Sequence, residues 1–303
     1  KIINEVKHKS LMIAQTPHTF SGIEVAILDL LSKKNQSPIY EIIGHKNSNP
    51  KIAYASVLFG NTPDETLKKA SDMRLKNFKA VKFGWQNFGI DLNNDKDHLI
   101  AAREGLENDL MLMVDAGAVW GNNVSEALKR VEILKEANVT WLEEPFYSDA
   151  FDEYSQLNKI SSLPLAGGES CHSVESAKNM IKYGNVKFIQ IDAGIAGGIL
   201  AGKDIAKFAE QNDVQYVNHT FTSHLQLSAS LQSYAGSLKS KLAEYPMQLK
   251  SLAWDITKNH IIMDKDGYIN IPSDIGHGMI INEDALFKYK VDVEIKVNQT
   301  KIF

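Results

Sequence analysis

Ionisable residues recur at a steady interval along this chain, and each lies at or just after the end of a short apolar run. Successive members are about 23 to 28 residues apart, and the stretches between them, such as 125–138 and 198–212, carry helical patterning. The series consists of Asp115, Glu143, Glu169, Asp192, His219 and Glu244. Strands and helices that alternate at a steady period predict a parallel (β/α) barrel. Because the strand ends of that fold meet on one face, we expect these side chains to form one active site.

Length and charge agree with a single barrel. The chain has 303 residues, and a (β/α) barrel typically needs about 250. A net charge of -4 offers no basic surface, so neither nucleic acid nor a membrane is an expected partner. One cysteine, Cys171, excludes an internal disulfide framework and indicates a cytoplasmic location.

The other strands and helices follow from local signals. We expect strands over 51–60 and 78–84, and helices over 62–75 and 96–108. Thr62 and Pro63 are residue types typical of a helix cap and a first helical residue. The segment 9–35 reads as helix, polar loop and helix, with Thr19, Ser21 or a near neighbour as the expected cap of the second helix.

Three carboxylates close three consecutive strands. Asp115, Glu143 and Glu169 each follow an apolar run, where burying an unpaired carboxylate is costly. Acidic residues at strand ends can also be solvated loop starters, but three in succession favour a shared function. Oxygen ligands without histidine or cysteine suit a hard divalent cation, so the sequence predicts a Mg²⁺ site.

Asp192 and His219 close neighbouring strands, after the three carboxylates. A carboxylate that accepts a hydrogen bond from an imidazole fixes its tautomer and raises its basicity, so the pair is a candidate general acid/base. A purely structural hydrogen bond is the alternative.

Lys82 and Glu244 complete the candidate catalytic residues. Lys82 ends the second strand, where proximity to a metal could depress its pKa and make it a base or an electrophile; an exposed strand-end lysine is the alternative. Glu244 ends the last strand, where a protonated carboxyl group could donate to an oxyanion; a salt bridge to a loop lysine is the alternative.

Aromatic residues are candidates for the pocket walls. Trp85 and His224 are expected to contact substrate, and Trp120 is a further wall candidate, although core packing explains such residues equally well. The pair Gly197 and Gly198 would open a helix where a phosphate could bind, but two glycines are weak evidence.

Several motifs in a fixed order resemble the enolase superfamily, specifically its mandelate racemase subgroup. They run from about residue 18 to the end of the chain: SGIEVAILDLL, NFKAVKFGW, LMVDAG, WLEEP, GGES, QIDAGIAGG, NHTFTSHLQLSAS, AEYP and INIPSDIGHGM. The resemblance implies that Asp115, Glu143 and Glu169 bind Mg²⁺ and that Asp192 and His219 form the catalytic acid/base pair. It also implies that Glu244 is the acidic residue at the end of the last barrel strand, and that the protein is a homo-oligomer.

The subgroup usually carries Lys-x-Lys at the end of the second strand, whereas this chain has a single lysine there. One alignment places Lys82 at the catalytic lysine, and we prefer it. Another places Gly84 there and leaves His219 as the sole strong base.

The resemblance implies an α/β fold, a modified TIM (β/α)7β barrel with a partial α+β capping domain. We expect a remnant of the N-terminal capping domain at 1–45, the catalytic barrel at 46–255 and a C-terminal segment at 256–303 that packs with the cap. About the first quarter of a typical member has no counterpart, so a longer protein is expected.

The implied function is Mg²⁺-dependent removal of the proton α to a carboxylate, followed by β-elimination. The expected substrate is a small carboxylate, an acid sugar, which would be dehydrated to a 2-keto-3-deoxy acid. A cycloisomerase that opens an anhydro-sugar acid and a racemase or epimerase of a 2-hydroxy acid are the alternative enzymes. A catalytically silent binding or structural barrel is the non-enzyme alternative.

Overall fold

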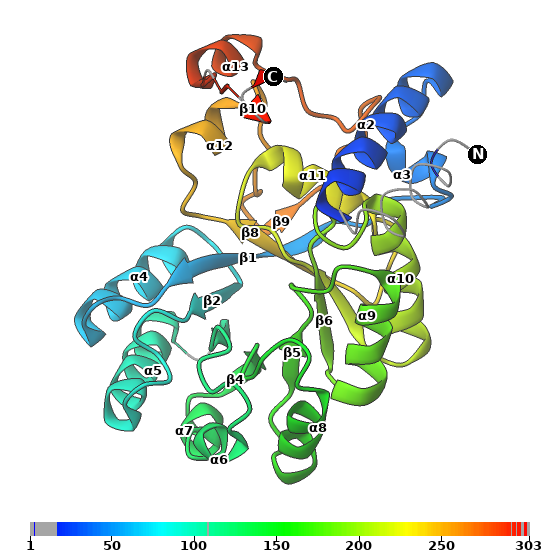
Figure 1. The fold of residues 1–303 in the computed structure, drawn as a ribbon. Helices are drawn as coiled ribbons and strands as arrows, with labels where there is room; N and C mark the ends of the chain where they lie inside the picture. The colour runs from blue at the N-terminus through cyan, green and yellow to red at the C-terminus, as the bar shows by residue number, and fades with distance from the viewer. Residues whose placement is uncertain are drawn as a thin grey trace.

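Eight parallel strands form a nearly closed barrel in the computed structural model, which describes residue 3 and residues 17–107, 109–291, 293–294, 296–297 and 300–301 (Figure 1). The strands are β1 (Lys51–Leu58), β2 (Ala80–Gly84), β3 (Met111–Asp115), β4 (Val139–Glu143), β5 (Leu165–Gly167), β6 (Phe188–Ile191), β7 (Gln215–Asn218) and β8 (Leu242–Pro246). Their hydrogen-bonded order is β7-β6-β5-β4-β3-β2-β1-β8. A short strand, β9 (Tyr268–Ile269), pairs antiparallel with the start of β1. The predicted (β/α)7β barrel is confirmed.

Helices connect successive strands and surround the barrel (Figure 1). They are α4 (Pro63–Leu75), α5 (Leu92–Leu106), α6 (Val124–Leu128), α7 (Val131–Glu136), α8 (Phe151–Ile160), α9 (Val174–Asn179), α10 (Ile199–Gln211) and α11 (His224–Gln232), with a π-helix, η2 (Met180–Gly184), continuing α9. Thr62 caps α4 as expected, because its hydroxyl accepts from the backbone N–H of Glu65. The helix expected over 125–138 is instead two short helices, α6 and α7.

Strand alternation places the functional side chains inside the barrel. A cluster of buried side chains inside the barrel, here called the plug, contains one residue from each strand: Tyr54, Ala80, Met113, Trp141, Ala166, Phe188, Val217 and Leu242. Successive side chains of a strand point to opposite faces, so a residue two positions after a plug residue also points inward. Lys82, Asp115, Glu143, His219 and Glu244 each occupy such a position, directly above the plug. The larger apolar cluster packs between strands and helices.

The side chain of Asn218 closes the seam between β7 and β8, which share no ladder in the hydrogen-bonded strand order. Its amide donates to the carbonyl of Glu244 (3.1 Å), and its amide oxygen accepts from the backbone N–H of Glu244 (3.0 Å). Tyr234 donates its hydroxyl proton to the same oxygen. Asn218 therefore replaces a strand ladder at the seam and fixes the height of Glu244 in the barrel.

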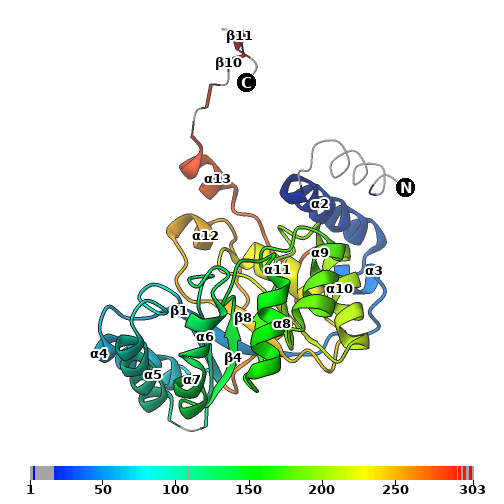
Figure 2. The same cartoon turned by 60° about the horizontal axis from the view of Figure 1, so that its bottom comes forward.

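Segments from both ends of the chain lie on one side of the barrel (Figure 2). The N-terminal part contributes α2 (Pro17–Asn35) and α3 (Ile39–Ile42), and the C-terminal part α12 (Ser251–Asp255), α13 (Glu283–Tyr289), β10 (Lys296–Val297) and β11 (Thr300–Lys301). The hydroxyl of Ser32 and the carboxylate of Asp29 accept from Gly276 and His277, so α2 is tied to the tail. The proposed domain division stays a prediction.

The start of α2 and its contact with α10 differ from the simplest expectations. The helix begins at Pro17, so Thr19 and Ser21 lie inside it, and Ser21 donates to the carbonyl of Pro17 (2.8 Å). At the start of α10, the backbone N–H groups of Ile199 and Leu200 donate to the carboxylate of Glu24. This carboxylate occupies the place where the glycine pair suggested a phosphate.

No helix within the described residues combines the length and the apolarity that crossing a bilayer requires.

Candidate active site

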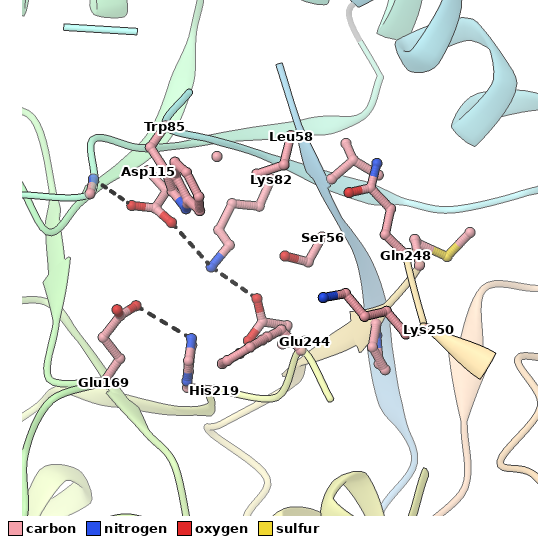
Figure 3. Close-up of a pocket in the computed structure, with 16 residues that line it drawn as sticks. Ser56, Leu58, Lys82, Trp85, Asp115, Glu169, His219, Glu244, Gln248 and Lys250 are labelled. Atoms are coloured by element: carbon pink, nitrogen blue, oxygen red, sulfur yellow. Dashed lines mark hydrogen bonds and ion pairs between the residues drawn. The ribbon is translucent and has the colours of Figure 1, made fainter. Parts of the chain in front are cut away.

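A cavity of about 550 Å³ opens at the carboxyl ends of the strands (Figure 3). Its walls comprise Ser56, Val57, Leu58, Lys82, Gly84, Trp85, Asp115, Gly117, Glu169, His219, Phe221, Glu244, Pro246, Met247, Gln248 and Lys250. Binding pockets for small molecules typically measure about 300–1,000 Å³. Most of the predicted site residues therefore converge on a cavity of suitable size.

Asp115, Glu143 and Glu169 form one cluster at the ends of β3, β4 and β5. Each offers an oxygen atom, and these atoms all lie within 4.8 Å of one another. Parallel register brings the first two together, because Asp115 pairs with Glu143 across β3 and β4. Asp115 and Glu143 are buried and Glu169 is partly buried.

The electrostatics of this cluster fit a divalent cation. Burial raises the pKa of Asp115 to about 7, opposed by Lys82 and assisted by repulsion from Glu169. Burial also raises the pKa of Glu143 to about 8, opposed by Lys82 and assisted by Asp115. Ionised carboxylates this close and this buried repel one another, and Lys82 brings only one positive charge, so a divalent cation would further stabilise the ionised cluster. An all-oxygen donor set of this kind suits Mg²⁺.

Lys82 lies at the centre of the acidic groups (Figure 3). Its ammonium pairs with Glu143 and with Glu244 (2.9 Å), and it is 3.9 Å from Asp115. Burial would lower the pKa of Lys82, but the charges of Glu143 and Glu244 outweigh it and hold that pKa well above its usual range. These carboxylates therefore hold Lys82 as an ammonium. The depressed pKa, which was expected beside a bound metal ion, stays a prediction.

Glu244 is a carboxylate rather than a protonated donor. Burial would raise its pKa, but Lys82 and His219 hold that pKa at about 2, and the backbone N–H of Thr220 donates to its oxygen (2.6 Å). Glu244 does form a salt bridge, but its partner is Lys82 on β2 rather than the loop lysine of the alternative reading.

His219 lies between two carboxylates. Its Nδ1 faces Asp192 at 3.4 Å, and its Nε2 faces Glu169 at 3.4 Å. The other carboxylate oxygen of Asp192 accepts from Gln226 (2.6 Å) and from the backbone N–H of Gly194 (2.7 Å), so Asp192 is fixed in place. Burial would lower the pKa of His219, but Glu244, Asp192 and Glu169 raise it to about 9.

The aromatic candidates divide between wall and interior. Trp85 lines the cavity, with 52% of its surface exposed. Trp120 is buried and donates to the carbonyl of Gly89 (2.9 Å), so it supports the β2–α5 loop instead. His224, expected to contact substrate, is not among the lining residues.

His224 is fully buried for a structural reason. Its ring packs edge-on against Tyr245, Trp254 and His260, and its Nδ1 accepts from the backbone N–H of Ile261 (3.2 Å). Tyr245 belongs to β8, and the other partners come from the segment after it, so His224 anchors that segment rather than facing the cavity.

Sequence reasoning missed Glu144 and most of the upper wall. Glu144 is buried beside the metal cluster and accepts from Tyr154 (2.8 Å) and from the backbone N–H of Gly168 (2.7 Å), which ties β4 to the loop that carries Glu169. Glu144 directly follows Glu143 in the sequence, and this pair of acidic residues is the signal that could have revealed it. Ser56, Phe221 and Lys250 gave no signal, because their places depend on how the strands close into a ring.

A family model described as "Enolase C-terminal domain-like" matches residues 65–285. That match covers most of the barrel, with all three cluster carboxylates, Lys82, Asp192, His219 and Glu244. The chain belongs to the enolase superfamily. Within it, the mandelate racemase/muconate lactonizing enzyme family is the group that its relatives represent, so the predicted family is confirmed.

Known proteins resemble both the sequence and the fold. D-galactarolactone cycloisomerase of Agrobacterium fabrum (strain C58) is 27% identical over 89% of this chain and 73% of its own length. Arabinonate dehydratase of Saccharolobus solfataricus (strain ATCC 35092) is 25% identical over 89% of this chain and 71% of its own. A crystal structure described as a predicted mandelate racemase from Rhodobacter sphaeroides is 42% identical, with a TM-score of 0.93, and the match covers 100% of this chain and 78% of that one.

This enolase superfamily chain is thus an enzyme of the class that abstracts the proton α to a carboxylate. Its class is lyase or isomerase, and the buried carboxylate cluster is the divalent metal site typical of the superfamily. A small carboxylate is the typical substrate of the family.

Proposed function

We propose that this protein dehydrates an acid sugar to a 2-keto-3-deoxy acid, with Mg²⁺ bound by Asp115, Glu143 and Glu169. The observation that carries the proposal is the position of His219, which shares one cavity with this carboxylate cluster. β-Elimination needs a group that removes a proton from Cα and a group that protonates the departing oxygen.

His219 serves as both groups in the proposed reaction. Its imidazole takes the proton from Cα, the electron pair of that bond forms the enediolate, and the bond from Cβ to its hydroxyl oxygen then breaks. The same imidazole returns the proton to this oxygen, so that water leaves and the resulting enol becomes the 2-keto acid. Asp192 holds the ring in place through Nδ1. Of the two candidate bases, His219 has the pKa nearer to neutrality, which favours it for proton transfer in both directions.

Lys82 contributes a fixed positive charge in this proposal. Its ammonium, held by Glu143 and Glu244, lies on the cavity floor and favours the negative charge that develops on the substrate. When bound, the divalent cation would hold the substrate carboxylate, neutralise the charge that develops on it and lower the pKa values of Lys82 and His219.

The cavity walls suit a hydroxylated chain. Ser56 and Gln248 offer hydrogen-bonding groups, whereas Trp85 and Phe221 offer flat apolar faces. Polar and charged groups at fixed places beside apolar walls set the orientation of a ligand. Such a mixture supports an acid sugar over a purely apolar carboxylic acid.

Cycloisomerisation is the second candidate, because one relative at 27% identity is a D-galactarolactone cycloisomerase. The proton removed from Cα would be the same, but a ring oxygen would leave and would remain attached to the product.

Product mass separates these reactions. With Mg²⁺ and a library of aldonic, uronic and aldaric acids and their lactones or anhydro forms, we expect a product that reacts with semicarbazide and is lighter than its substrate by one water. A keto product of unchanged mass would identify cycloisomerisation instead. Unchanged mass without a keto group, but with inverted configuration at Cα, would identify racemisation or epimerisation and overturn the elimination.

A further inference from the structure

The cavity has a second polar end, across the barrel from the carboxylate cluster of Asp115, Glu143 and Glu169. In the strand order, β8 and β1 lie opposite β4 and β5, which carry Glu143 and Glu169. Lys250 and Gln248 follow β8 and Ser56 lies on β1, and all three line the cavity. Figure 3 shows them on the side away from Asp115 and Glu169.

Among the described cationic residues that line this cavity, Lys250 is the one that lacks an acidic partner. Lys82 pairs with Glu143 and Glu244, and His219 lies between Asp192 and Glu169. Within the part of the chain that the structure describes, Lys250 is exposed to the cavity and makes no ion pair. An unpaired ammonium in a pocket is a natural partner for an anionic group of a ligand.

The anchoring of the segment around Lys250 favours a binding role. Tyr245 and Trp254, which flank this segment, pack on the buried ring of His224, and the hydroxyl of Tyr245 donates to the carbonyl of Ile261 (2.8 Å). The backbone that carries Lys250 is therefore held on both sides, which lowers the entropic cost of using its side chain as a ligand contact.

We propose that Lys250, with Gln248 and Ser56, binds a second carboxylate at the far end of the substrate, so that the preferred substrate is an aldaric acid rather than an aldonic acid. The inference rests on the proposed function, since the reacting carboxylate is placed at the cluster of Asp115, Glu143 and Glu169. One ammonium with two neutral donors matches the single charge of a carboxylate. A phosphate, with a charge of about -1.5 to -2, would remain undercompensated.

Binding of unreactive acids tests this end of the cavity apart from turnover. Adipate and hexanoate have the same chain length and differ by the second carboxylate, and neither carries a hydroxyl group that could be eliminated. In calorimetric titrations with Mg²⁺ present, we expect the protein to bind adipate about 10-fold more tightly, the ratio that one charge-assisted hydrogen bond supplies.

Variants assign that preference to one side chain. Lys250→Met is expected to bring the ratio close to one, and Lys250→Arg to retain most of it. Lys258→Met is the matched control, because Lys258 is exposed nearby in sequence but does not line the cavity, and it should keep the full ratio. Equal affinity for both acids in the unaltered protein, or a preference that survives Lys250→Met, would overturn the proposal.

Turnover separates a failure of this inference from a failure of the proposed function. Suppose that the protein prefers adipate through Lys250 but eliminates water from no acid sugar. This result would contradict the proposed function and support the second-carboxylate site. Dehydration with the same kcat/KM for aldarates and aldonates of matched configuration would support the proposed function and contradict the second-carboxylate site.

Discussion

The variant His219→Asn is expected to lower kcat by about 1,000-fold, because a positioned general acid/base contributes about 100- to 10,000-fold. Asparagine keeps a polar side chain beside Asp192 but cannot carry a proton between Cα and the leaving oxygen. The measurement is steady-state formation of 2-keto acid with the substrate that the library identifies. His18→Asn is the matched control, because His18 is exposed on α2, and its kcat should match that of the unaltered protein.

The same variant also tells a chemical role from a structural one. His219→Asn should keep the stabilisation by Mg²⁺ described below, since it removes no member of the carboxylate cluster. Unreduced turnover would exclude His219 as the acid/base and return that role to Lys82.

Mg²⁺ is expected to stabilise the protein through Asp115, Glu143 and Glu169. At 100 times its Kd, a ligand that binds only the native state adds about 2.7 kcal/mol, which corresponds to a rise in Tm of roughly 5 °C for a protein of this size. Thermal melts of chelator-treated protein with and without Mg²⁺ measure the effect. Glu143→Gln and Asp115→Asn should abolish most of it, whereas Glu210→Gln, on the exposed side of α10, should not.

The pH dependence of this stabilisation follows from two raised pKa values. The pKa values of Asp115 and Glu143, about 7 and about 8, lie above the ordinary values of 3.8 and 4.5. Between those limits the folded, cation-free protein holds protons that the unfolded chain has released, so its stability falls as the pH rises through this window. Cation binding needs the ionised carboxylates, so the rise in Tm with Mg²⁺ should grow with pH and level off above about pH 8. A rise in Tm that is the same at pH 5 and pH 8 would contradict this assignment of ligands.

Strand periodicity explains why so much of this site could be predicted from sequence. Four site residues each follow an inward-facing apolar residue by two positions: Asp115, Glu143, His219 and Glu244. The same alternation that directs the plug residues inward therefore directs these ionisable side chains into the barrel above them. The interval between strands then predicts the barrel, and the barrel predicts that strand ends converge.

The misplaced residues depend on contacts between distant parts of the chain. His224 is buried because Trp254 and His260, about 30 residues later, pack on its ring, and no local pattern announces that contact. The protonated state expected of Glu244 is wrong for a similar reason. Lys82 holds Glu244 as a carboxylate across β1, which lies between their strands in the sheet.

Loss of the proton from Cα is the central claim, and isotope release tests it most directly. An acid sugar carrying deuterium at Cα, incubated with the protein and Mg²⁺, is followed by NMR of both product and solvent water. We expect the label to enter water at the rate of turnover, and expect chelator and His219→Asn each to stop its release. An acid converted to product with its label retained on carbon would contradict proton abstraction, and with it the role assigned to every residue around this cavity.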